Sequence, residues 1–126
     1  MNTLTLNGRT FASGATRDTD SGKPDYEGYL SPVVIEAYGA YMLKHQHLPD
    51  GTVRPSDNWQ LGIPKAELMK SMWRHFLSAW KKHRLGGDPT EDLCGILFNA
   101  MGYLHALKTQ THENPTAEVS ETRIRP

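Results

Sequence analysis

The chain has 126 residues, a length typical of one domain with a modest core. Its 14 Lys and Arg residues balance its 14 Asp and Glu residues, so the composition predicts no broad attraction to nucleic acid or to an anionic membrane. The single cysteine excludes an intramolecular disulfide. Together with the lack of a long apolar span or a secretion signal, this predicts a soluble, cytoplasmic protein with no membrane partner.

Residues 1–30 are predicted to form an arm or a short hairpin. They are rich in Gly, Thr, Ser and Asp, and only TLTLNGRTF alternates around an Asn-Gly pair, the usual cue for a tight turn. The pattern changes at Ser31, a plausible N-cap that is followed by Pro32. The uninterrupted run VVIEAYGAYMLKHQ then predicts a helix over residues 32–46.

Residues 47–62 contain two prolines, two glycines and two aspartates and are predicted to be a connector. Connectors of this length tend to be functional or mobile. A second helix is predicted from Pro64 to the Gly86-Gly87 stop, because its apolar residues recur at steps of three and four and make one wide buried stripe.

The third helix has the clearest start signal. Asp88 is a predicted N-cap, Pro89 suits the first helical position, and Glu91 is placed to complete a capping box. The helix is predicted to end near Lys108. Residues 109–126 are polar and without periodicity, which favours a flexible tail.

The predicted fold is therefore mainly α, a small bundle of three main helices over residues 31–108 with an N-terminal arm or short hairpin. Three helices of this size make a thin core, and the first and third are apolar around much of their circumference. We expect a partner surface, most simply a second copy of the chain that completes the bundle as a homo-oligomer.

The third helix carries polar residues where burial is expected. Asp92 and Asn99 are seven residues apart and share a stripe, because such positions differ by about 20° around a helix. Gly95 and Gly102 lie beside that stripe, so this edge combines polar groups with little bulk and could admit a ligand. Alternatively, Asp92 interacts with the helix dipole and the glycines allow a close helix crossing.

Each helix also places one carboxylate at or near its packed side: Glu36, Glu67 and Asp92. Such a set suits a hard divalent cation that retains waters for a phosphate substrate. Basic and imidazole groups could then hold phosphate oxygens, and the candidates are Lys23, Arg74 and His75. The alternatives are a surface pair for Glu67 and Arg74 and a satisfied core residue for His75.

Several segments in order resemble a small phage-encoded family, described as the dATP/dGTP diphosphohydrolase N-terminal domain. They are DSGKPDY, LSP with a glutamate four residues on, DNW followed by GIP, WRHFLSAW, and DP before EDLCGILFNA, and they span about residues 17–108. DLCGILFN is also loosely similar to a helix of MazG-type all-α nucleoside triphosphate pyrophosphatases. The chain lacks their paired Glu-x-x-Glu, since Lys70 follows Glu67 at that spacing and Gly39 follows Glu36.

The resemblance implies Mg²⁺- or Mn²⁺-assisted hydrolysis of purine deoxynucleoside triphosphates in the phage nucleotide pool. Metal ligation and catalysis would fall to Glu36, Glu67 and Asp92. Phosphate contacts would fall to Lys23, Arg74 and His75, and contacts with sugar or base to Asn58, Trp59 and Asn99. Trp59 could equally anchor the connector. A non-catalytic nucleotide-binding sponge or sensor, and a helical protein-interaction module, are the alternative functions.

Overall fold

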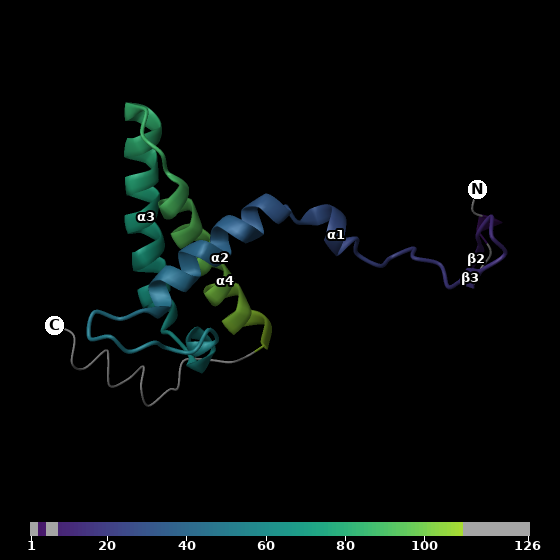
Figure 1. Cartoon of the computed structure of the whole chain (residues 1–126), viewed down its shortest axis with the longest axis horizontal. Helices are drawn as coiled ribbons and strands as arrows, with labels where there is room; N and C mark the ends of the chain where they lie inside the picture. The colour runs from purple at the N-terminus through teal and green to yellow at the C-terminus, as the bar shows by residue number, and fades with distance from the viewer. Residues whose placement is uncertain (1–2, 5–7, 110–126) are drawn as a thin grey trace. The chain divides into compact units, whose positions relative to one another are not determined.

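Three long helices make up most of the described chain, so the predicted mainly helical fold is confirmed (Figure 1). The structure is a computed structural model that describes residues 3–4 and 8–109. The chain divides into two compact units, Met1–Val34 and Ile35–Pro126. The predicted tail, apart from Thr109, lies outside the described residues.

The first unit contains a small antiparallel sheet of three two-residue strands. They are β1 (Thr3–Leu4), β2 (Arg9–Thr10) and β3 (Thr16–Arg17), in the order β1-β2-β3. The pairing of β1 with β2 agrees with the predicted hairpin, although the turn itself lies outside the described residues. The third strand was not predicted, nor was the short helix α1 (Tyr26–Tyr29), which is capped by Asp25.

Helix α2 (Pro32–Gln46) has the predicted bounds. Ser31 acts as its cap, since the Ser31 hydroxyl accepts a hydrogen bond of 3.3 Å from the backbone N–H of Val34. The connector that follows has local order, with a β-bridge between His47 and Val53 and a 3₁₀ helix, η1 (Asn58–Leu61).

Helices α3 (Lys65–Leu85) and α4 (Thr90–Thr109) form an antiparallel hairpin (Figure 1). Helix α3 ends as predicted, at Gly86, whose φ of 80° is the left-handed conformation that glycine adopts without strain. Asp88 accepts hydrogen bonds from the backbone N–H and hydroxyl of Thr90. Glu91 forms an ion pair with Lys44 of α2, which differs from its predicted capping-box role.

The buried apolar core is small, as expected for helices of this size. It consists of Tyr41, Leu68, Ala79, Cys94 and Ala106. Many larger apolar side chains on the three long helices are at least two-fifths exposed, including both tryptophans of α3. None of the described helices combines the length and hydrophobicity that a bilayer crossing requires.

Candidate functional site

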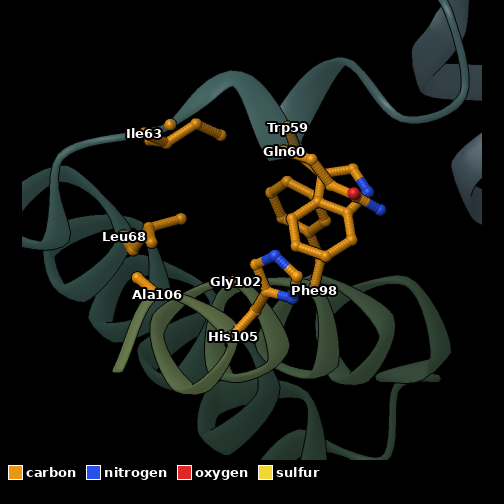
Figure 2. A pocket seen from close by; sticks show the side chains of 9 residues that line it. Trp59, Gln60, Ile63, Leu68, Phe98, Gly102, His105 and Ala106 are labelled. Atoms are coloured by element: carbon orange, nitrogen blue, oxygen red, sulfur yellow. The ribbon is translucent and has the colours of Figure 1, made fainter. Parts of the chain in front are cut away.

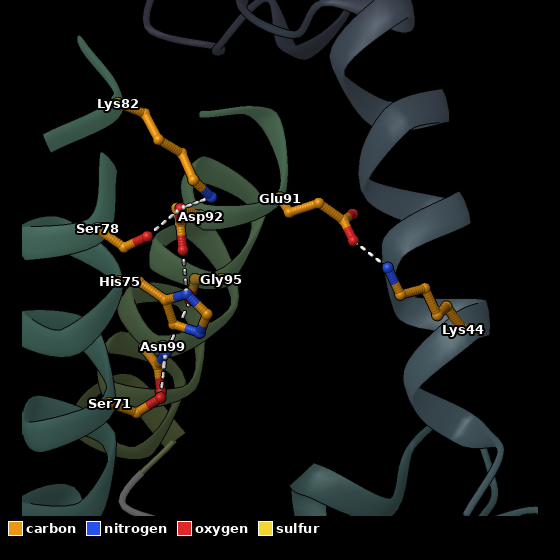
Figure 3. Close-up of polar contacts among 9 residues, drawn as sticks. All are labelled: Lys44, Ser71, His75, Ser78, Lys82, Glu91, Asp92, Gly95 and Asn99. Carbon is orange, nitrogen blue, oxygen red and sulfur yellow. Dashed lines mark hydrogen bonds and ion pairs between the residues drawn. The ribbon is translucent and has the colours of Figure 1, made fainter. Parts of the chain in front are cut away.

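Asp92 is buried in the seam between α3 and α4 and is held by three donors from α3 (Figure 3). The Lys82 ammonium lies 2.6 Å from Oδ2, and the Ser78 hydroxyl donates to the same oxygen at 2.7 Å. His75 Nδ1 lies 3.0 Å from Oδ1. The three donors stand on successive turns of one α3 face, so both carboxylate oxygens are satisfied from a single helix.

This arrangement keeps Asp92 ionised. Burial raises the pKa of the carboxyl group, but the hydrogen bonds from Lys82, Ser78 and His75 and the charge of Lys82 outweigh it and lower the pKa to about 2. The burial of the Asp92 carboxylate between α3 and α4 is therefore explained by the ammonium and hydroxyl groups that α3 presents to it.

His75 packs directly on α4 at Gly95. A Cβ atom added at Gly95 would lie 2.5–2.6 Å from three atoms of the His75 ring, so only glycine leaves room for the imidazole. Its Nδ1 faces Asp92, and a donated Nδ1 proton fixes the tautomer in which Nε2 is an acceptor. Nε2 has no hydrogen-bond partner within the described part of the chain.

Asn99 lies two turns further along the same α4 face and is 2% exposed. Its amide N–H₂ donates to the Ser71 hydroxyl at 3.2 Å and to the Gly95 carbonyl at 2.7 Å. The predicted common stripe of Asp92 and Asn99 is thus a polar seam that joins α4 to α3.

The seam opens into a pocket of about 300 Å³ within the helical unit. Four of the six predicted substrate-binding residues line it: Asn58, Trp59, His75 and Asn99. They come from the connector, α3 and α4. Further polar lining is contributed by α2, the connector and α3 through Tyr41, His45, Gln46, Arg54, Ser56 and Ser71.

Trp59 anchors the connector to α4, where it faces Phe98 and His105 across a small space (Figure 2). Trp59 also borders the larger pocket. Its ring centroid lies 4.9 Å from that of His105 and 6.5 Å from that of Phe98, both in edge-on geometry. The space beneath it is about 10 Å³, room for roughly one water molecule. The pocket wall is therefore held in place by an aromatic contact.

The other predicted site residues do not line this pocket. Glu36 is exposed on α2, and Arg74 is exposed on α3. Glu67 is half-buried, with a carboxylate oxygen 3.5 Å from the Lys70 ammonium. Lys23 is exposed in the other unit.

The predicted metal ligands do not form one donor set within the described residues. No group of three or more His, Cys, Asp and Glu side chains suited to a metal ion occurs across residues 3–4 and 8–109. Both oxygens of Asp92 already accept from α3. The Mg²⁺ or Mn²⁺ role of Glu36, Glu67 and Asp92 stays a prediction.

Several residues of the site were missed by sequence reasoning. Lys82 and Ser78 hold Asp92, and Arg54 and His45 line the pocket. Ser71, His75, Ser78 and Lys82 recur at steps of four, three and four, which is the signal that could have identified a polar seam on α3. Arg54 carries no such signal, because it lies in an irregular connector.

Comparisons with models of known protein families, with characterised proteins and with solved structures find no match to this chain.

Proposed function

We propose that this chain binds a purine deoxynucleoside triphosphate in the pocket beside His75 and hydrolyses it to the monophosphate and pyrophosphate, with a divalent cation as cofactor. The observation that carries the proposal is the convergence of Asn58, Trp59, His75 and Asn99 on one cavity. These residues come from three separate segments, and the sequence alone predicts each of them as a substrate contact. The pocket volume falls at the lower end of the range for small-molecule sites.

The lining has the chemistry that a nucleotide requires. Trp59 offers an aromatic surface to a base, and the Asn58 and Asn99 side chains carry amide donors and acceptors. Arg54 supplies a permanent positive charge with a forked set of donors, which suits phosphate oxygens. His45, whose ring is tilted by 49° against that of Tyr41 with centroids 4.3 Å apart, adds a second imidazole.

The His75–Asp92 pair supports the hydrolytic half of the proposal. With Nδ1 donating to Asp92, Nε2 is available to accept a proton from a water molecule in the pocket. The water oxygen forms a bond to the α-phosphorus, the bond from that phosphorus to the bridging oxygen breaks, and pyrophosphate leaves. Asp92 stabilises the resulting imidazolium, because its depressed pKa keeps it negative.

A second candidate function is nucleotide binding without turnover, as in a sponge or sensor. The observation that favours it is the saturation of Asp92 by Lys82, Ser78 and His75, because a carboxylate that accepts three hydrogen bonds is a poor ligand for a cation. In this case the pocket and its donors act only in recognition.

One experiment separates the two functions. The purified protein is incubated with each dNTP and Mg²⁺ or Mn²⁺, products are separated by chromatography, and binding is measured by calorimetry. Release of monophosphate and pyrophosphate from dATP or dGTP supports hydrolysis. Tight binding without product supports the sponge. If no dNTP binds and none shifts the Tm, both functions are refuted and a protein-interaction module is favoured.

A matched pair of histidine variants assigns the activity to the pocket. His75→Gln is expected to lower turnover by about 10²–10⁴-fold, the usual contribution of a general base. His83→Gln changes an exposed histidine in the last turn of the same helix and is expected to leave turnover unchanged. Equal activity of the two variants contradicts a role for His75.

Because deoxynucleotides are cytoplasmic metabolites, the proposal also implies a cytoplasmic protein. If the chain is phage-encoded, that compartment is the cytoplasm of the host cell.

A further inference from the structure

The connector begins with a tight hairpin over residues 46–54, termed the connector hairpin. Its turn is the sequence PDG at residues 49–51, a composition typical of hairpin turns. Asp50 Oδ1 accepts hydrogen bonds from the backbone N–H of Thr52 at 3.0 Å and from its hydroxyl at 2.6 Å. The turn is therefore fixed by its own side chains, and the segment is ordered although it lies outside the helices.

The connector hairpin is fastened to the C-terminus of α2. The last four carbonyls of a helix have no partner within the helix and are satisfied from outside it. His47 Nδ1 lies 3.1 Å from the Leu43 carbonyl, and the backbone N–H of Arg54 donates to the Gln46 carbonyl at 3.0 Å. A β-bridge pairs His47 with Val53. Both ends of the hairpin are thus held at the end of α2.

Gln46 fixes the backbone of Arg54 from both sides. In addition to accepting from the Arg54 N–H, Gln46 donates from its side-chain Nε2 to the Arg54 carbonyl at 2.9 Å. One residue therefore binds both backbone polar groups of Arg54. Pro55 adds a local constraint, because the residue before a proline is disfavoured in the helical conformation. The backbone of Arg54 is fixed, and only its side chain keeps its freedom.

The Arg54 side chain lines the pocket and keeps its charge available. Among the residues that the structure describes, no acid forms an ion pair with Arg54. Asp50, the acid of the connector hairpin, accepts from Thr52 instead. A guanidinium group presents a planar fork of donors that matches phosphate oxygens. An arginine on a fixed backbone at the wall of a pocket is therefore suited to bind an oxyanion there.

We propose that Gln46 is a positioning residue, which holds Arg54 against the pocket as a preformed subsite for the phosphate oxygens of the triphosphate. The inference rests on the proposed function and names the residue that places the positive charge of its pocket. Preorganisation of this kind raises affinity, because less conformational freedom is lost on binding. A hairpin that served only to cap α2 would contribute to stability and leave phosphate affinity unaffected.

Calorimetric titration of the full chain with inorganic tripolyphosphate tests the inference. Gln46→Met removes the side-chain donor but keeps an unbranched chain of similar length. It is expected to weaken tripolyphosphate binding about three- to tenfold, the effect of one hydrogen bond, and to leave deoxyadenosine binding unchanged. Gln60→Met, at an exposed glutamine of η1 outside the pocket, is the matched control and is expected to bind tripolyphosphate as the wild type does.

A double-mutant cycle with Arg54→Ala separates positioning from the other roles that Gln46 can have. If Gln46 acts through Arg54, Gln46→Met causes no further loss of tripolyphosphate affinity once Arg54 is alanine. An equal loss in both backgrounds indicates direct contact or a purely structural role and overturns the inference. A wild type that does not bind tripolyphosphate also overturns it, and this measurement stands even if a variant fails to fold.

The inference and the proposed function fail in different ways. Tripolyphosphate binding that depends on Gln46 and Arg54 together, without turnover of any dNTP, supports the inference and refutes hydrolysis. Turnover of dATP or dGTP with the same KM in wild type and Gln46→Met supports hydrolysis and overturns the inference.

Discussion

The buried Asp92 carboxylate yields a quantitative prediction about stability. Asp92→Asn keeps the size of the side chain but removes its charge and one acceptor, so Lys82, Ser78 and His75 lose their common anionic partner. The pKa shift from 3.8 to about 2 corresponds to about 2 kcal/mol at about 1.4 kcal/mol per unit. Because the Lys82 side chain is 41% exposed, solvent screening reduces the expected loss to about 1–2 kcal/mol.

The pH dependence has a definite sign. The folded pKa of Asp92 is depressed, so its contribution to the free energy of unfolding is complete above the unfolded pKa near 3.8 and is lost as the pH falls toward about 2. The stability gap between wild type and Asp92→Asn is therefore expected to be largest near neutral pH and to close over this acidic window. Near neutral pH it corresponds to a Tm lower by roughly 5–15 °C for a unit of this size.

Urea unfolding followed by circular dichroism at a series of pH values measures the gap. Glu91→Gln is the matched control, because it removes the neighbouring acid, whose ion pair with Lys44 is exposed and is expected to contribute less than about 1 kcal/mol. A gap for Asp92→Asn that is the same at neutral pH and near pH 2, or no larger than that of the control, contradicts a stabilising role for the ionised Asp92 carboxylate.

The remaining predictions concern the packing of His75 and the charge of the pocket. Gly95→Ala is expected to displace the His75 ring and to weaken dNTP binding in calorimetry. Gly102→Ala is the control and is expected to bind dNTP normally, because its added Cβ meets Leu68 at an ordinary 3.4 Å. Equal affinities of the two variants contradict the packing role of Gly95. Arg54→Ala is expected to weaken triphosphate binding about tenfold or more while sparing the nucleoside, and more than Arg74→Ala does, because only Arg54 lines the pocket. A larger loss for Arg74→Ala restores the role predicted from the sequence.

The helix bounds were predictable because their signals are local. Ser31 before Pro32, Gly86 after the second helix and Asp88 before Pro89 act through the backbone groups of their own turns. The same holds for the common face of Asp92 and Asn99, which depends only on helical periodicity.

The partners of the buried polar groups were not predictable in this way. Periodicity places Lys82 and Ser78 on one face of α3, but their contact with Asp92 depends on how the hairpin closes. Likewise, Glu36 shares an apolar stretch of sequence with Ile35 and Ala37, yet it is exposed because α2 packs on the other helices over only part of its surface. A residue in the connector, such as Arg54, has no periodicity to place it.

The most direct test of the central claim is a crystal structure of the chain with a non-hydrolysable dGTP or dATP analogue and Mn²⁺. We expect the analogue in the cavity lined by Trp59, His75 and Asn99, with phosphate oxygens within hydrogen-bond distance of Arg54. An analogue bound at any other surface, with this cavity unchanged, contradicts the claim.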